Sequence, residues 1–250
     1  MAGHSHSANI ARRKGAVDAK RGKVFSKLAR AIISAARQGG GDPKANLKLQ
    51  YAIEKARAAN MSKDTIKNAI EKGTGAKSGD DFVEIIYEGY GPGGVAVVVA
   101  CLTDNRHRTA PDIKYCFDRG GGNLGAPGSV LFQFDFKSVI AVERGGRSED
   151  ALTELALEVG AEDVQVEGET AVLYAAATEF ISVKAALEAK GEKFLSAALE
   201  YTPKSRTPVA DKDDARKLLK LIDALEDNED VQNVFSNYDV PSEWLDELGA

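Results

Sequence analysis

The sequence predicts a multidomain α+β protein, with an N-terminal three-helix domain followed by two α+β domains, the second inserted in the first. Apolar residues recur at the 3.6-residue period of helices until about residue 72, and the pattern then becomes strand-like. The charge also changes sign along the chain. Residues 1–79 hold 17 Lys and Arg against 5 Asp and Glu, a balance of +12, whereas the rest holds 16 against 33, a balance of −17. We therefore expect a polyanion-binding module on an acidic body.

The first 18 residues show little periodicity, and we expect a flexible arm that becomes ordered on its partner. From about residue 19 to 38, basic and apolar side chains fall on opposite sides of a helix. The alternative interpretation of this basic side is a solvated surface that pairs with the acidic domains of the same chain. The candidate polyanion-binding residues of the arm and helix are Arg12, Arg13, Lys14, Lys20, Arg21, Lys23, Lys27 and Arg30.

Two more helices follow at short spacing. Asp42 as N-cap and Pro43 at the first helical position predict the start of the second helix, and Asn60 predicts a left-handed cap at its end. Ser62 predicts the N-cap of the third helix, which we expect Gly73 to stop. Three helices with short connections predict a small bundle, and we place this domain at residues 1–79.

Strands are predicted after a glycine-rich linker at residues 72–79. Residues 82–90 and 95–103 form a hairpin, and a helix at 108–119 and a strand at 129–136 follow. A second series then has the ferredoxin-like order β-α-β-β-α-β. Its elements are predicted at residues 138–143, 148–159, 163–167, 171–176, 179–190 and 195–201.

The tail supplies a helix at 212–225 and a strand at 231–237, the two elements that the first α+β series lacks. We infer a discontinuous ferredoxin-like domain at 80–136 plus 206–250, with a second ferredoxin-like domain inserted at 137–205. An isolated helix and strand could not bury their apolar faces, which favours this arrangement over a free C-terminal helix. The acidic run at 226–230 is interpreted as solvated surface.

Several classes of protein are excluded. The longest apolar run, residues 95–102, is too short to span a membrane, and the start has no apolar signal region. Cys101 and Cys116 are not spaced like a disulfide framework or a metal site. The three histidines have no nucleophile or acid–base partner at a catalytic spacing. We expect a cytoplasmic, monomeric, non-enzymatic protein without metal or cofactor.

A second candidate site lies where a strongly apolar strand leads into a helix. Backbone amides at a helix start favour anions, and arginine forks bind phosphate. The alternative is a capped turn in which Arg106 and Arg108 pair with Asp104 and Asp112. The glycine-dense stretch at 120–129 permits close approach of a ligand but equally suits a loop that returns to a strand. The candidate residues here are Asn105, Arg106, Arg108 and Thr109.

Several motifs of the chain resemble the signatures of the YebC/PmpR family. The N-terminal signature covers Met1-Ala2-Gly3-His4-Ser5, Asp18-Ala19-Lys20-Arg21-Gly22-Lys23 and Asn60-Met61. The central ones cover Tyr87-Glu88-Gly89-Tyr90-Gly91-Pro92-Gly93-Gly94, Thr103-Asp104-Asn105-Arg106 and Gly128-Ser129-Val130. The chain departs from the pattern at His6-Ser7, where the family usually has Lys-Trp, at Ala11-Arg12, where it usually has Lys-His, and at Pro111.

The resemblance implies a helical N-terminal domain and two ferredoxin-like domains. It also implies two possible functions, because members have been described as DNA-binding transcription regulators and as ribosome-associated translation factors. The latter include a mitochondrial translational activator of cytochrome oxidase and bacterial members that relieve stalling at proline runs. We expect a translation factor that binds ribosomal RNA; the alternative is a transcriptional regulator on duplex DNA. The third helix offers mostly phosphate-type contacts, from Lys63, Lys67, Asn68 and Lys72.

Overall fold

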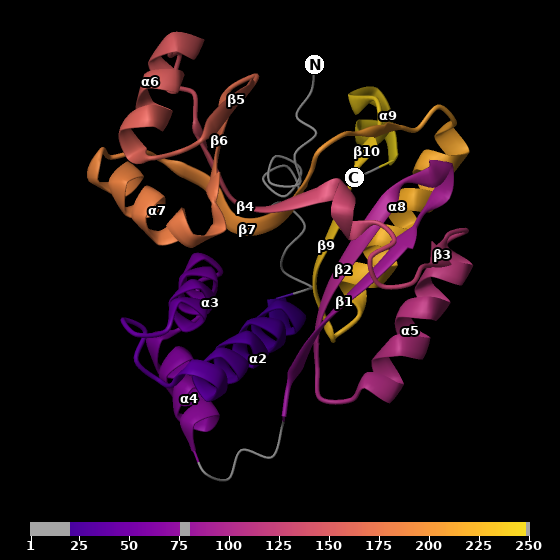
Figure 1. The fold of residues 1–250 in the computed structure, drawn as a ribbon, viewed down its shortest axis with the longest axis horizontal. Coiled ribbons are helices and arrows are strands. Elements are labelled where there is room, and N and C mark those ends of the chain that lie inside the picture. The colour runs from indigo at the N-terminus through magenta and orange to yellow at the C-terminus, as the bar shows by residue number, and fades with distance from the viewer. Residues whose placement is uncertain (1–20, 76–80, 249–250) are drawn as a thin grey trace.

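The computed structural model describes residues 21–75 and 81–248. Figure 1 shows three bodies: a group of helices from the N-terminal part and two sheets that carry helices. The expected fold class, a three-helix region followed by two α+β sheets, is confirmed. Among the described residues, no helix is both long and apolar enough to cross a lipid bilayer.

The three-helix region packs around one apolar core. Ile32 and Leu49, on different helices, are fully buried in it. Asn60 and Ser62 lie in the connection between the second and third helices. Both predicted caps are confirmed, because Asn60 has a left-handed φ of 62° and the Ser62 hydroxyl accepts a hydrogen bond from a backbone N–H. The helices are α2 (Arg21–Gly39), α3 (Leu47–Ala58) and α4 (Lys63–Thr74).

The predicted start of the second helix is wrong. Asp42 and Pro43 lie in a turn, in which Asp42 Oδ1 accepts a hydrogen bond from the backbone N–H of Lys44. The helix begins at Leu47, and its N-cap is Asn46, whose Oδ1 accepts from Leu49 N at 3.1 Å. The amide group of Asn46 also donates to two carbonyl groups at the end of α2, which an aspartate could not do.

Gly73 does not stop the third helix. It lies inside α4 and is buried against α2, where a Cβ atom would stand 2.5 Å from the carbonyl oxygen of Ile33 and 2.8 Å from Cβ of Ala36. The glycine is therefore needed for the close approach of two helices rather than for a helix end.

The first sheet is antiparallel, in the order β3-β1-β2-β9. Alternate residues of β2 face opposite sides, so Val97 and Val99 pack under the helices while Val98 belongs to a second core on the other face. Figure 1 shows α5 and α8 on the same face of this sheet. The elements are β1 (Val83–Tyr90), β2 (Ala96–Thr103), β3 (Asn123–Leu124), β9 (Val231–Ser236), α5 (Arg106–Arg119) and α8 (Lys212–Asp227).

The predicted strand at 129–136 is wrong in its first five residues and in the sheet to which it was assigned, and only residues 134–136 are a strand. Leu131–Gln133 form a single 3₁₀ turn, and the strand that follows, β4 (Phe134–Glu143), belongs to the second sheet. The first sheet instead has the two-residue strand β3, which pairs with Gly89 and Tyr90 of β1. The predicted boundary between residues 136 and 137 lies inside β4, and the division into domains stays a prediction.

The second sheet has the strand order β5-β6-β4-β7, as expected for a ferredoxin-like arrangement. Its helices cover one face, where Leu152 and Leu187 are fully buried. The elements are β5 (Asp163–Glu167), β6 (Thr170–Ala176), β7 (Phe194–Pro203), α6 (Glu149–Val159) and α7 (Phe180–Ala189).

The tail contributes to the first sheet. Its helix α8 covers that sheet and its strand β9 pairs antiparallel with β2. Shorter elements complete the tail, namely β8 (Thr207–Pro208), β10 (Tyr238–Asp239), which pairs parallel with β8, and α9 (Ser242–Leu248).

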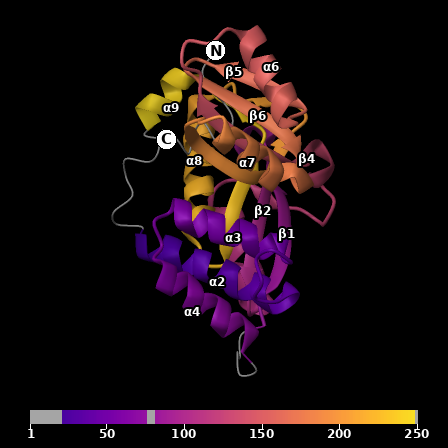
Figure 2. The same cartoon turned by 90° about the vertical axis from the view of Figure 1, so that its left-hand side faces the viewer.

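The three-helix region contacts both sheets. The backbone N–H of Leu199 in β7 donates to the hydroxyl of Tyr51 on α3 at 2.9 Å, and the Tyr51 ring meets Phe180 of α7 edge-on. Figure 2 shows α3 on the side of the helical region that faces α7. An apolar cavity of about 600 Å³ lies between the three bodies, lined by residues of α2, α3, β1, β2, β7 and β9 among others.

Candidate nucleic-acid interface

Part of the predicted site lies outside the described residues. Arg12, Arg13, Lys14 and Lys20 belong to this part, and Arg21 begins α2 without a described side chain. The remaining candidates form two groups, one on the basic side of α2 and one at the start of α5.

The basic side of α2 lies against the end of α8 and the turn after it, a segment that reads Glu226-Asp227-Asn228-Glu229-Asp230. We call these five residues the acidic segment. Lys27 Nζ donates to the backbone oxygen of Glu226 at 2.6 Å, and Lys23 Nζ lies 4.0 Å from Asp227 Oδ1. Burial lowers the pKa of Lys27, against the opposing effect of Glu226 and Asp227. The interpretation of this run as solvated surface is therefore incomplete, because it contacts α2.

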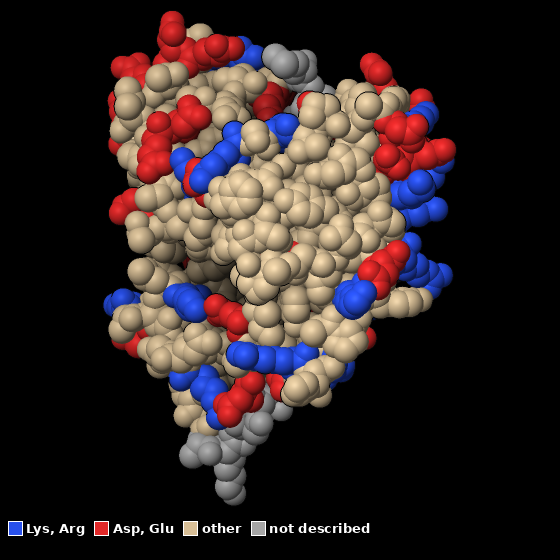
Figure 3. Space-filling view, turned by 45° about the vertical axis from the view of Figure 1, so that its right-hand side comes forward, with Lys and Arg blue, Asp and Glu red and all other residues tan. Residues whose placement is uncertain are grey.

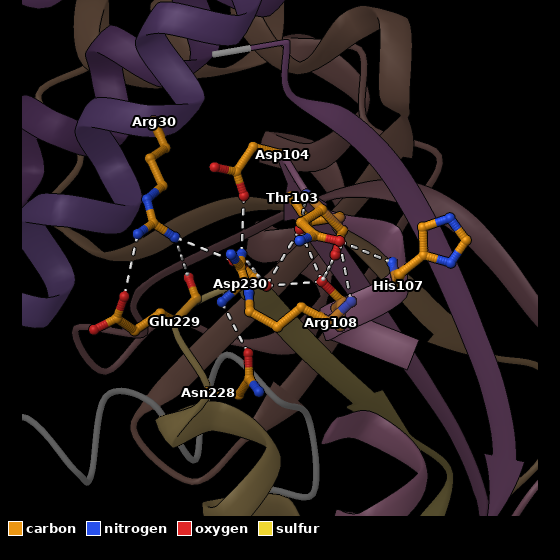
Figure 4. Close-up of polar contacts among 10 residues, drawn as sticks. Arg30, Thr103, Asp104, His107, Arg108, Asn228, Glu229 and Asp230 are labelled. Atoms are coloured by element: carbon orange, nitrogen blue, oxygen red, sulfur yellow. Dashed lines mark hydrogen bonds and ion pairs between the residues drawn. The ribbon is translucent and has the colours of Figure 1, made fainter. Parts of the chain in front are cut away.

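Arg30 forms the most extensive of these contacts. Its Nη2 lies 3.2 Å from Glu229 Oε2, and its Nη1 donates to the backbone oxygen of Glu229 and lies 3.3 Å from Asp230 Oδ1. Figure 4 shows Arg30 reaching from α2 to these two residues. Further along α2, Arg37 pairs with Asp81 at 2.7 Å. In this structure the basic side of α2 is thus paired within the chain, as the alternative interpretation expected.

Asp230 connects the two groups of candidates. Arg108 Nη2 lies 3.0 and 2.9 Å from its two carboxylate oxygens, and Oδ2 also accepts from Thr109 Oγ1 at 2.7 Å and Thr103 Oγ1 at 3.2 Å. Burial would raise the pKa of Asp230, but the hydrogen bonds from Arg108 and the two threonines and the charge of Arg108 outweigh it and lower the pKa. Arg108 and Thr109 therefore bind the Asp230 carboxylate and do not form an open phosphate-binding site.

The other two candidates at the start of α5 differ in role. Asn105 is the N-cap, and its Oδ1 accepts from the backbone N–H groups of His107 and Arg108, each at 3.1 Å. Figure 4 shows the His107 ring pointing away from Asp230. The Arg106 side chain is exposed and has no ion-pair partner among the described residues. The capped-turn alternative thus describes most of this motif, with Arg108 bound to Asp104 and Asp230 rather than to Asp112.

The glycine-dense loop is held by Glu88, a residue that the sequence prediction missed. Glu88 is 4 % exposed, and its carboxylate accepts three backbone hydrogen bonds, from Gly128, Val130 and Leu131, at 2.6, 2.9 and 2.7 Å. Burial would raise its pKa, but these three bonds outweigh it and lower the pKa. The sequence signal that could have identified Glu88 is its position: it is an acidic residue inside the predicted strand 82–90, shortly before the turn that leads into the apolar strand 95–103.

The three-helix region keeps some basic side chains free of such partners. Lys44 and Lys63 are exposed and have no ion pair among the described residues, whereas Lys67 pairs with Glu71 one helical turn away. These lysines lie in α4 and in the turn before α3. In the described part of the chain, no group of three or more His, Cys, Asp or Glu side chains could hold a metal ion.

Comparison with known protein families gives two matches that together span most of the chain. Residues 5–76 match the family described as TACO1/YebC protein N-terminal domain, and residues 82–238 match TACO1/YebC second and third domain. A crystal structure of a conserved hypothetical protein from Aquifex aeolicus is similar, with a TM-score of 0.81 and 47 % sequence identity, over 90 % of this chain and 93 % of that one.

Curated relatives match over their full length. A protein of Treponema pallidum is 51 % identical over 245 residues, which are 98 % of this chain and all of the relative. A protein of Rubrobacter xylanophilus is 49 % identical over 251 residues, covering both chains completely. Both are named probable transcriptional regulatory proteins, names that describe regulators rather than enzymes. The resemblance in the sequence is thus confirmed, and the chain belongs to the TACO1/YebC family.

Proposed function

We propose that this protein is a non-enzymatic regulator of gene expression that binds nucleic acid through its N-terminal region. The observation that carries this proposal is the charge division, with a balance of +12 in residues 1–79 and −17 in the rest. Nucleic acids attract clustered Lys and Arg through their phosphates, and the acidic body repels them, so the division orients the docking.

The proposed contact surface comprises the N-terminal basic residues and the exposed lysines around α4. Figure 3 shows a broad face of the molecule with few charged side chains at its centre and most of them at its rim. Such a face has few Lys and Arg side chains that could bind phosphates, which supports a contact through the helical region instead.

Duplex DNA and ribosomal RNA are the two candidate targets of this protein. The names of the relatives support transcription, and therefore duplex DNA, better than they support the ribosome. Ribosomal RNA is supported by the resemblance described above. The exposed lysines of α4 suit contacts to a phosphate backbone, which do not depend on base sequence. A translation factor that relieves stalling, for example at proline runs, is the function that this second target implies.

A paired binding experiment distinguishes the targets. Co-sedimentation with purified ribosomes and retention of duplex DNA of varied sequence are measured at the same near-physiological salt concentration. Ribosome association without sequence-selective DNA binding assigns the protein to translation, and the reverse result assigns it to transcription. Binding of neither at any salt concentration would contradict the proposed function.

Site-directed variants test the surface. We expect K44A/K63A to weaken binding and to reduce the slope of log affinity against log salt by roughly one for each phosphate that is no longer neutralised. The control is K190A/K193A, which removes two lysines from the second sheet region, where Lys190 and Lys193 pair with Glu158 and Glu143. Equal effects of both variants would exclude a localised surface on the helical region.

A further inference from the structure

We propose that the acidic segment is an internal competitor for nucleic acid, which covers the basic side of α2 and must separate from it before α2 can bind phosphates. This inference rests on the proposed function and adds a regulatory contact to it. The contact is formed by residues 226–230 and the helix α2, which they cover.

The acidic segment engages the described basic side of α2 from Lys23 to Arg30, and Asp81 engages its far end. Lys23, Lys27 and Arg30 bind the acidic segment, and Arg37 binds Asp81 near the start of β1. The atoms offered to α2 are carboxylate oxygens, which resemble the anionic oxygens of a phosphate backbone in charge, and carbonyl oxygens, which resemble them as hydrogen-bond acceptors. A bound nucleic acid would compete for the same donors.

The outer part of the contact is built from exposed ion pairs that are weak in water, whereas the Arg30–Asp230 pair and the Lys27–Glu226 bond are partly buried. The side chains of Lys23 and Asp227 are 53 % and 52 % exposed, and that of Glu229 is 71 % exposed. Exposed ion pairs contribute little to stability and weaken with salt. An open polar cavity of about 430 Å³, lined among others by Arg30, Arg108 and Glu229, lies at this contact, and the larger apolar cavity lies between the same bodies. The surfaces are therefore incompletely packed.

Separation would leave Asp230 with hydrogen-bond partners. Asp230 is the one deeply buried acid of the segment, and it keeps Arg108, Thr103 and Thr109 as donors when Arg30 departs. All three donors belong to the first sheet and its helix α5. Arg30 and Lys27 would move into water, where their charges are well solvated. The charged groups of this contact thus keep partners or water when α2 and the acidic segment separate.

Neutralisation of the two exposed acids tests the inference. D227N/E229Q removes the charges opposite Lys23 and Arg30, and E158Q/E162Q is the matched control, because Glu158 and Glu162 also form exposed pairs with lysines, on the second sheet region. The probes are purified ribosomes and a random-sequence DNA duplex. We expect D227N/E229Q to bind the probe that the wild type binds about three- to tenfold more tightly at low salt, and the control about equally to the wild type.

A second measurement reports on the contact without any nucleic acid. Acetylation of individual lysines by acetic anhydride is followed by mass spectrometry, with the exposed Lys63 as internal reference. In the wild type and the control, Lys27 should react more slowly than Lys63, because its Nζ is covered and bonded to the Glu226 carbonyl oxygen, and this obstruction outweighs the gain in free amine from its lowered pKa. In D227N/E229Q the rate for Lys27 should approach that for Lys63.

Each outcome decides between the two proposals. Tighter binding together with faster acetylation of Lys27 supports the competitor. Salt-dependent binding by the wild type, with no gain in D227N/E229Q over the control, overturns the competitor and leaves the proposed function intact. Absence of binding by the wild type and both variants overturns the proposed function and the competitor with it, whatever the acetylation rates.

Discussion

Arg108 and Asp230, which lie 122 residues apart in the sequence, form an ion pair in which Nη2 is 2.9 Å from Oδ2. The pair joins the first turn of α5 to the start of β9 and so ties the tail of the chain to the middle of the first sheet region. Together with the two threonine hydroxyls, it satisfies the carboxylate of a residue that is only 3 % exposed.

Removal of this carboxylate should destabilise the protein. We expect Asp230→Ala to lower the free energy of unfolding by about 2–4 kcal/mol, because Arg108 and two buried hydroxyls lose their acceptor. Urea denaturation measures this loss. Asp112→Ala, an exposed acid on α5, should change the free energy of unfolding by less than about 0.5 kcal/mol, and a similar loss in both variants would contradict the prediction.

Glu88→Gln should loosen the glycine-dense loop. The glutamine side chain keeps one acceptor oxygen, but its NH₂ group would face backbone N–H groups of the loop, which are also donors. We therefore expect a loss of about 2–4 kcal/mol in the free energy of unfolding. Amide hydrogen exchange should accelerate at Val130 and Leu131. Glu84→Gln, in the same strand but paired with Lys48 at the surface, should lose less than about 1 kcal/mol and leave the loop amides unchanged.

The pH dependence of stability follows from the lowered pKa of Glu88 and Asp230. The unfolded chain titrates these groups near the ordinary values of 4.5 and 3.8, so their contribution is complete above those values and is lost as the pH falls through the lower folded pKa. The free energy of unfolding should therefore drop steeply below about pH 4.5. The difference between the wild type and Glu88→Gln should shrink over the same range, and a difference that stays constant would refute this assignment.

Gly73→Ala should destabilise the protein although alanine is the better helix former. Helix propensity alone would give a gain of about 1 kcal/mol, but the added Cβ would overlap the Ile33 carbonyl oxygen, and we expect a net loss of about 1–3 kcal/mol. Gly22→Ala in α2 has no atom within 4 Å of the added Cβ and should not be destabilising. Thermal unfolding of both variants measures the two effects.

Asn46 and Asp42 allow a direct comparison of the observed and the predicted helix cap. Asn46→Ala should lower the free energy of unfolding by about 2–3 kcal/mol, because a helix cap and two hydrogen bonds to carbonyl groups are lost. Asp42→Ala should have an effect of about 0.5 kcal/mol or less, since Asp42 is exposed and bonds within its own turn. Urea denaturation of both variants compares them, and the reverse order of the two losses would contradict the structure.

These two residues also show what the sequence can and cannot predict. Ser62, Asn60 and the tail helix have local signals, and the structure confirms them. The choice of Asn46 over Asp42 depends on carbonyl groups of α2, which no local pattern reveals. The strand predicted at 129–136 follows an alternating pattern, but Glu88 binds the amides of Val130 and Leu131 and a 3₁₀ turn results.

The candidate site was predictable only in part. The basic side of α2 follows from the periodicity of the sequence. Its contact with the acidic segment joins residues about 200 positions apart, and the sequence left pairing within the chain as one of two interpretations. Arg108 was chosen because arginine at a helix start can bind phosphate, whereas the structure gives it Asp230. Glu88 and Asp230 resemble ordinary acidic residues in the sequence, and only their burial distinguishes them.

The pairing of β2 with β9 has a consequence for the order in which the protein folds as it is synthesised. All four strands of the second sheet lie between Phe134 and Pro203, so that sheet can close while the tail is still being made. The first sheet begins earlier in the chain, but its valine-rich strand β2 keeps an unpaired edge until β9 emerges. Of the two four-stranded sheets, the one that is started first is therefore completed last, and the nascent chain exposes an apolar strand edge for much of its synthesis.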